Sequence, residues 1–396
     1  MGTTNVQPGA NLQEDCKDLR NALKGLLCNE KKVVDILGRR TQQQRDAIAE
    51  AYKTLFDESL HKHLKSSMSG KLQKCLLLWM MDPSERDALL LHEALREGGL
   101  KKDRAVIAML CTRTTGQLYL IKQAYYSVFN ETLENHLDGS GFVFFEPQTK
   151  SIWAFWRSSE PKIKEPPKRA LAITKLLLAL ARGSRPENST VDRHIALTDA
   201  HQLNKVCSGR LGNEENLIRI FSTRSASQLT ATMNFYQQHY GHDFEKALSK
   251  KDAGEFLQAL KVVVQCLRQP SRFYAEELWA VLSGAVNDDD TLIQIITTRA
   301  EVDLKSLKSE FTSESKKSLE EVIGNKTVGN FREFLLTIVN PRDHVVLRTP
   351  RVSDSSGTSY YMSPRSNGSR HRSYSSQNDS YYSGSAGSSS SNSFQL

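Results

Sequence analysis

The sequence has no apolar run long enough to cross a membrane. Its most apolar stretches, KLLLALA and KVVVQCL, are far shorter than the roughly 18–20 residues that a spanning helix needs. The opening residues, MGTTNVQPGANLQED, have no apolar core of a secretory signal, and Val6 stands where a myristoylation signal has Ser or Thr. We therefore expect a soluble protein without a transmembrane segment.

The sequence also has no paired cysteines and no catalytic signature. Its six cysteines are scattered, without a CxxC motif or a Cys/His cluster, which predicts a reduced, cytoplasmic protein without structural zinc. Walker A, HExxH and GxSxG motifs are missing, so we do not expect an enzyme. The HKH stretch at His61 and His63 has no evident carboxylate or cysteine partner, which predicts two surface histidines.

Positive charge is in excess. The chain has 53 Lys and Arg against 45 Asp and Glu, a net charge of +8. This excess favours an anionic partner, either lipid headgroups or nucleic acid, without choosing between them.

A short motif that ends in Arg-Arg or Thr-Arg recurs four times in the sequence. The second residue of this pair is the anchor of each copy: Arg40, Arg113, Arg224 and Arg299, at intervals of 73, 111 and 75 residues. A glycine lies fifteen residues before each anchor: Gly25, Gly98, Gly209 and Gly284. An aromatic residue lies twelve after it: Tyr52, Tyr125, Tyr236 and Phe311. Large apolar residues follow at twenty (Leu60, Leu133, Phe244, Leu319) and twenty-four (Leu64, Leu137, Leu248, Ile323). A register kept over four copies predicts a repeat array.

Each copy reads as about five helices, because its apolar residues recur at helical spacing. The Thr or Ser beside the anchor suits a helix N-cap, and the anchor arginine is expected to donate to carbonyls at helix ends. Gly70, Gly254 and Gly329 are expected to end a helix at its C′ position. No strand signal of comparable strength occurs outside FVFFE. The prediction is an all-α fold of four stacked repeats.

The expected domains follow from this register. They are an N-terminal tail (1–11), repeat 1 (12–83), repeat 2 (84–192), repeat 3 (193–268), repeat 4 (269–342) and a tail (343–396). The long second interval contains an insertion at about 138–167, which is either a binding loop or a gene-model artefact, and a linker at about 183–192.

These four copies, with TRS-like phrases and a glycine loop fifteen residues upstream, resemble the annexins over residues 12–342. TRAEVDL and LIRIFSTR resemble plant annexins in particular. The resemblance implies a slightly curved disc of four five-helix repeats. It also implies calcium-dependent, peripheral binding to acidic phospholipid membranes, with calcium as the cofactor.

The resemblance places each calcium site between a K-G-x-G-T loop and a carboxylate about 42 residues after the first glycine. Calcium needs six to eight oxygen ligands, and the carboxylate also supplies charge. Here the second glycine of the loop is replaced by Leu27, Leu100, Leu211 and Val286. The carboxylate is replaced by Ser67, Ser140, Lys251 and Lys326. The sequence therefore predicts weak, shifted or absent calcium dependence.

Two copies offer shifted candidates for a metal. Copy three has Gly209, Gly212 and Asp252, and copy four has Gly284 with Asp288, Asp289 and Asp290. The alternative for the three aspartates is that they are first-turn acids favoured by the dipole of a helix.

The same loops are rich in basic and aliphatic residues, which makes them candidates for direct lipid binding. The candidates are Lys24, Leu27, Leu100, Lys101, Lys102, Arg210, Leu211, Lys251, Val286 and Lys326. The alternatives are a solvated basic surface and ordinary loop packing.

Two further features leave room for protein or RNA partners. The tail has many Ser, Tyr and Arg residues and cannot bury a core, so we expect it to be disordered, and such tails bind RNA or protein. The triplet Ile218-Arg219-Ile220 resembles a segment proposed for actin contact in plant annexins, although core packing of Ile218 with an exposed Arg219 also explains it. A calcium-independent scaffold for actin or other proteins is therefore the alternative function.

Overall fold

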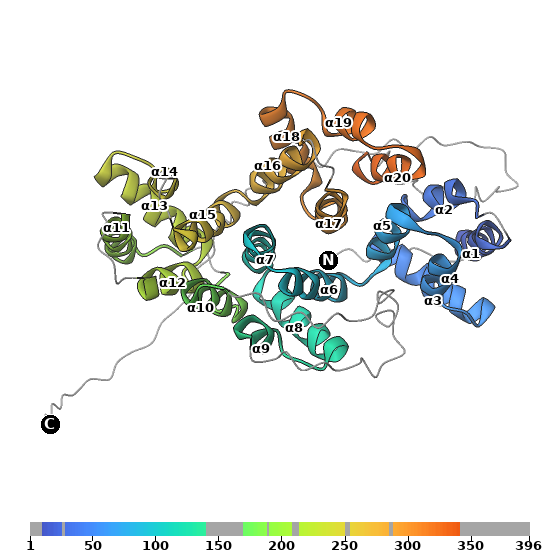
Figure 1. Cartoon of the computed structure of the whole chain (residues 1–396), viewed down its shortest axis with the longest axis horizontal. Helices are drawn as coiled ribbons and strands as arrows, with labels where there is room; N and C mark the ends of the chain where they lie inside the picture. Colours follow the sequence, from blue (N-terminus) through green and yellow to red (C-terminus); the bar gives the residue numbers. More distant parts are fainter. Residues whose placement is uncertain are drawn as a thin grey trace, which may run out of the picture. The chain divides into compact units, whose positions relative to one another are not determined.

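The computed structural model describes residues 10–25, 28–139, 169–187, 190–207, 214–249, 254–284 and 288–340. Within these ranges every regular element is an α-helix, which confirms the predicted all-α fold (Figure 1). The FVFFE stretch, nearly all of the insertion and the tail from 341 onward lie outside the described residues.

The helices come in four groups of five, as the repeat predicts. The first group is α1 (Ala10–Leu23), α2 (Glu30–Leu37), α3 (Gln42–Phe56), α4 (Leu60–Ser67) and α5 (Gly70–Met80). The second is α6 (Pro83–Glu97), α7 (Leu100–Thr112), α8 (Thr115–Phe129), α9 (Leu133–Asp138) and α10 (Leu171–Ala181). The third is α11 (Arg193–Cys207), α12 (Glu214–Thr223), α13 (Ala226–Tyr240), α14 (Phe244–Leu248) and α15 (Glu255–Arg268). The fourth is α16 (Pro270–Ser283), α17 (Asp289–Arg299), α18 (Leu304–Ser315), α19 (Leu319–Lys326) and α20 (Gly329–Val339).

The residues that keep register across the copies are core residues. The four aromatic side chains twelve residues after the anchors are all 0% exposed, and those at twenty and twenty-four are at most 2% exposed. The sequence period therefore records a packing requirement, because each copy must fill the same interior positions.

The buried tyrosines need partners for their hydroxyl groups, and histidines supply them. The Tyr52 hydroxyl lies 2.6 Å from Nδ1 of His63, and the Tyr125 hydroxyl lies 2.5 Å from Nδ1 of His136. His61 is also buried, with Nε2 3.2 Å from the Met80 carbonyl oxygen. The prediction of surface histidines was therefore wrong, and burial lowers the pKa of both His61 and His63.

The predicted N-caps occur in three copies. Thr41 and Thr114 form capping boxes with Gln44 and Gln117, and the Ser225 hydroxyl accepts from a backbone N–H of α13. Copy four has Ala300 at this position, and α18 begins only at Leu304.

The glycines that were expected to end helices begin them instead. Gly70 and Gly329 are the first residues of α5 and α20, with φ of +70° and +64°, and Gly254 is the N-cap of α15. The preceding helices α4 and α19 have already ended at Ser67 and Lys326, so the glycine serves the sharp entry into the next helix.

The anchor arginines bind carboxylates rather than backbone carbonyls, which corrects the expected role. In three copies a fork of two hydrogen bonds joins the anchor to an aspartate of the first helix of the same copy. The pairs are Arg40 with Asp15 at 2.8 and 2.8 Å, Arg113 with Asp87 at 2.6 and 3.3 Å, and Arg224 with Asp199 at 2.7 and 3.2 Å. Charge-assisted, bidentate pairs are stronger than bonds to neutral carbonyls.

Copy four holds its anchor arginine with different partners. Tyr274 lies twenty-five residues before the anchor, the spacing that the aspartate has in copies one and three, and the guanidinium of Arg299 lies 4.7 Å from the centre of its ring. The carboxylate comes from Asp303 instead, at 2.9 Å from Nε of Arg299. A cation–π contact and a local ion pair replace the helix-to-helix fork.

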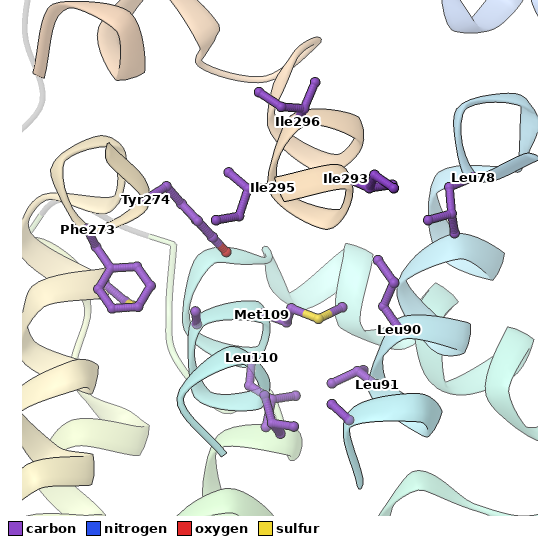
Figure 2. Close-up of a cluster of buried hydrophobic side chains, with 14 of the residues drawn as sticks. Leu78, Leu90, Leu91, Met109, Leu110, Phe273, Tyr274, Ile293, Ile295 and Ile296 are labelled. Atoms are coloured by element: carbon purple, nitrogen blue, oxygen red, sulfur yellow. The ribbon is translucent and has the colours of Figure 1, made fainter. Parts of the chain in front are cut away.

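Buried side chains join the copies to one another. Helix α2 packs against α20 and α5 against α17, while α7 packs against α15 and α10 against α12. Figure 2 shows the place where α17 meets the first two copies, with Ile293 beside Leu78 of α5 and Leu90 of α6. All three side chains are at most 5% exposed, so the core runs from copy to copy.

Replacing Arg113 with Met should lower the free energy of unfolding by about 3–5 kcal/mol, because it leaves the carboxylate of Asp87 buried without a counter-charge. The two side chains are 7% and 5% exposed. Urea unfolding followed by circular dichroism measures the change. The matched control is Arg39→Met, since Arg39 is 48% exposed and 3.9 Å from Asp35, and it should change little. Equal losses in the two variants would contradict a special role for the buried pair.

Candidate functional site

The candidate site is the set of loops that join the first helix to the second and the fourth helix to the fifth in each copy. The structure describes these loops for copies one and four in large part and for copy two in part. The following candidates lie outside the described residues: Leu27, Ser140, Gly209, Arg210, Leu211, Gly212, Lys251, Asp252 and Val286.

In copy one the two loops bind each other directly. Ser67 is the last residue of α4, and its hydroxyl donates to the carbonyl oxygen of Leu23 at 3.0 Å. Gly25 follows two residues later with φ +104°, and Lys24 between them is exposed. The residue at the carboxylate position therefore contributes a hydrogen-bond donor to the carbonyl at the end of α1.

In copy two the loop is a short glycine turn that exposes an apolar residue. Gly98 and Gly99 have φ of +64° and +90°, and α7 begins at Leu100, whose side chain is 49% exposed. Lys102 turns back to Glu97, with Nζ 2.7 Å from its carboxylate. Lys101 instead crosses to copy four and binds Asp288.

In copy four each of the three neighbouring aspartates binds a lysine from another copy. Asp288 binds Lys101 of α7, Asp289 binds Lys71 of α5, and Asp290 lies 2.9 Å from Nζ of Lys74 of α5. These lysine partners are 187–218 positions away in the chain, so no spacing in the sequence indicates them. The three acids therefore tie copy four to copies one and two.

Asp288 also caps α17. Its carboxylate accepts from the backbone N–H of Thr291 at 3.1 Å and from the Thr291 hydroxyl at 2.7 Å. Partial burial would raise the pKa of Asp288, but the hydrogen bonds from Lys101 and Thr291 outweigh burial and lower the pKa to about 2. Asp289 and Asp290 occupy the first turn of α17, as the helix-dipole alternative predicts.

The carboxylate position of copy four holds an exposed cation. Lys326 is the last residue of α19 and is exposed, and Val328 two residues later is 75% exposed. Gly284, at the other end of this site, caps α16 in an extended conformation with φ −65°. A charged and an apolar side chain thus lie together at the junction of α19 and α20.

The Ile218-Arg219-Ile220 triplet presents one side chain. Ile218 and Ile220 are 8% and 0% exposed, while Arg219 is exposed. Core packing therefore accounts for both isoleucines, as the sequence-based alternative states.

Two features are absent from the described ranges. No helix there is long and apolar enough to cross a membrane. No group of three or more His, Cys, Asp or Glu side chains in that part of the chain is arranged to hold a metal ion.

Comparison with known sequences identifies annexins as relatives of this chain. The Annexin family matches residues 14–79, 198–263 and 273–338, which leaves copy two unmatched. Human annexin A13 is 32% identical, with 84% of this chain and 96% of the relative covered. The annexin-like protein RJ4 of Fragaria ananassa is 30% identical, with 87% and 100% covered. Human annexin A7 is 32% identical over 84% of this chain, which spans only 63% of that protein.

Solved structures give the same answer. Annexin III superposes with a TM-score of 0.73 at 28% identity, covering 84% of this chain and 94% of that one. Chicken annexin V superposes with a TM-score of 0.71 at 28% identity, covering 84% and 96%. Calcium-bound annexin (Sm)1, at a TM-score of 0.67 and 22% identity over 83% and 90% of the two chains, shows the shared fold. By its repeats, its fold and these relatives, the chain belongs to the annexin family.

Proposed function

We propose that this protein binds acidic phospholipid membranes peripherally, from the cytoplasm, by direct attraction between lysines and lipid rather than through calcium at the family's usual sites. The observation that carries the proposal is the exposure of both Lys326 and Val328 at the junction of α19 and α20. An exposed ammonium occupies the position of the calcium-binding carboxylate, beside a side chain that is 75% exposed and apolar.

The side chains at the described sites are not suitable ligands for calcium. Calcium is held by carboxylate and carbonyl oxygens. Copy one offers a neutral hydroxyl that already donates to the Leu23 carbonyl oxygen at the end of α1. Copy four offers Lys326, and a cation at about 4 Å from a divalent ion repels it by about 1 kcal/mol or more per unit charge even in bulk water. The carboxylates of Asp288, Asp289 and Asp290 each face a lysine.

The same loops have what an interfacial surface needs. Leu100 and Val328 are 49% and 75% exposed, and Leu171, at the start of α10, is 70% exposed. Lys24 and Lys326 are exposed basic residues, Lys24 directly after α1 in the first of these loops and Lys326 at the end of α19 in the second. Apolar tips with basic neighbours gain from burial at the headgroup boundary and from attraction to an anionic leaflet. The candidates outside the described residues, from Leu27 to Val286, remain predictions.

Co-sedimentation with phosphatidylserine vesicles tests the proposal, in EGTA or 1 mM calcium and in low or high salt. We expect pelleting in EGTA that high salt abolishes, because screening shortens the reach of the lysine charges from about 10 Å at 0.1 M to 3 Å at 1 M. Pelleting that requires calcium would refute the lysine account and move attention to Gly209, Gly212 and Asp252. No pelleting in any condition would favour the alternative, a scaffold for actin or other proteins.

Single substitutions of the loop lysines should weaken vesicle binding. Lys24→Gln and Lys326→Gln should each lower the partition coefficient about five-fold in EGTA at low salt, since each lysine near the surface contributes about 1 kcal/mol. The matched control is Lys53→Gln, because Lys53 is also exposed but lies within α3, outside these loops. A loss of the same size in the control would mean that net charge alone drives binding.

Asp288→Asn should separate the structural role of this acid from a metal-binding one. Asparagine caps a helix as well as aspartate does, so the change keeps the cap and removes the charge together with the second acceptor oxygen. The pKa of Asp288 is about 2 in the folded chain, below the unfolded value of roughly 3.9, so its ionised form stabilises the fold above about pH 4. The stability gap between wild type and variant should narrow as the pH falls from 4 toward 2.

Chemical unfolding at pH 6, 4 and 3 measures this gap. A gap that is constant with pH would show that the carboxylate charge does not support the fold. A gap that appears only when calcium is added would instead assign Asp288 to a metal site.

A further inference from the structure

Buried arginines gather where copies one, two and four meet. Three of them come from the three copies, and each has a carboxylate within hydrogen-bond distance. The pairs are Arg113 with Asp87 at 2.6 Å, Arg45 with Glu301 at 2.8 Å, and Arg299 with Asp303 at 2.9 Å. The charges of these three pairs cancel.

A fourth arginine in the cluster has no carboxylate partner among the described residues. Arg86, in the first turn of α6, is 6% exposed. Its Nε and Nη1 atoms are buried and have no hydrogen-bond partner among the described residues. The charges that act on it are those of Asp87 and Glu301, which already bind Arg113 and Arg45, together with those two arginines themselves.

Among the described residues, this arrangement leaves one buried positive charge without a counter-charge. Arginine does not give up its proton in proteins, so it cannot escape the cost of burial by becoming neutral. Burial lowers the pKa of Arg86, and its place in the first turn of a helix adds the positive end of the helix dipole. A buried charge of this kind is stable only with a counter-charge and hydrogen-bond acceptors.

We propose that Arg86 binds a small oxyanion of the phosphate class at the junction of copies one, two and four. The oxyanion supplies the missing negative charge and acceptor oxygens for the Nε and Nη1 donors. Guanidinium groups bind phosphate oxygens well because their N–H groups are planar and fixed in direction. The cluster also holds two further buried nitrogens without a partner in the described chain, Nε of Arg45 and Nη1 of Arg299.

The cluster contains its own reporter. The guanidinium of Arg45 lies 3.7 Å from the centre of the Trp79 ring, and Trp79 is 3% exposed. An anion that binds Arg86 or Arg45 should change the electrostatic environment of the Trp79 ring and therefore its fluorescence. Trp79→Phe identifies the part of the signal that comes from this residue.

The test is a titration of the full chain with inorganic phosphate, with sodium chloride used to hold the ionic strength constant. Wild type should show a saturable fluorescence change and a rise in melting temperature. Arg86→Met should weaken phosphate binding at least ten-fold. In chloride alone it should melt at or above the wild-type temperature, because it removes an unbalanced buried charge. Arg39→Met, at an exposed arginine, should match wild type in both respects.

Three results would overturn the proposal. One is a wild type that shows no saturable response to phosphate, which would mean that water satisfies Arg86. Another is an equal response in Arg86→Met. The third is an Arg86→Met variant that melts well below wild type in chloride, because Arg86 would then have a counter-charge within the chain.

The source of the phosphate group is settled by a parallel vesicle assay with phosphatidic acid. Loss of free-phosphate binding alone in Arg86→Met assigns the site to a soluble anion, and loss of both free-phosphate binding and vesicle binding assigns it to a headgroup. The lysine substitutions at Lys24 and Lys326 should leave free-phosphate binding unchanged, so failure of the membrane proposal and failure of this one are distinguishable.

Discussion

A forked ion pair between an arginine and an aspartate fixes the start of each of the first three repeats. It joins the first helix to the turn after the second, and the N-capped third helix begins directly after the arginine. The helices must meet at this point for the apolar residues twelve, twenty and twenty-four positions later to share one core. Copy four keeps the arginine and replaces the aspartate with Tyr274 and Asp303, which shows that the position of the charge matters more than its exact partner.

Ion pairs between repeats also determine which charged residues remain available to bind a membrane or a metal ion. Lysines and aspartates that look like membrane or metal ligands in the sequence, such as Lys101 and Asp288, bind each other across copies. Asp289 and Asp290 are occupied in the same way by Lys71 and Lys74. Among the described loop candidates, Lys24 and Lys326 have no ion pair within the described chain. The membrane proposal therefore rests on these two lysines and on the exposed Leu100 and Val328.

The sequence predicted the fold because the repeat register records burial. Positions that hold a large apolar residue in all four copies, such as Leu60 and its equivalents, can be recognised without coordinates. The N-caps at Thr41, Thr114 and Ser225 are local, since their partners lie three residues away. Both kinds of signal lie within one helix or one period.

What the sequence did not predict depends on contacts between distant segments. His63 looks like a surface residue because its neighbours are polar, yet it is the partner of a tyrosine on another helix. The partners of Asp288, Asp289 and Asp290 lie in other repeats. The unbalanced charge of Arg86 appears only when three repeats are brought together. Gly70 and Gly329 were correctly predicted to lie at helix boundaries, but they begin the next helix and do not end the preceding one. A positive φ occurs at both kinds of boundary, so the residue type alone does not tell them apart.

Calorimetric titration of calcium into the full chain, with phosphatidylserine vesicles present, tests the central claim most directly. The account predicts no saturable calcium binding in the micromolar range and no change in vesicle affinity, because the described sites offer a hydroxyl, an ammonium and lysine-bound carboxylates. Saturable binding of calcium at micromolar concentration, with tighter attachment to the vesicles, would contradict it.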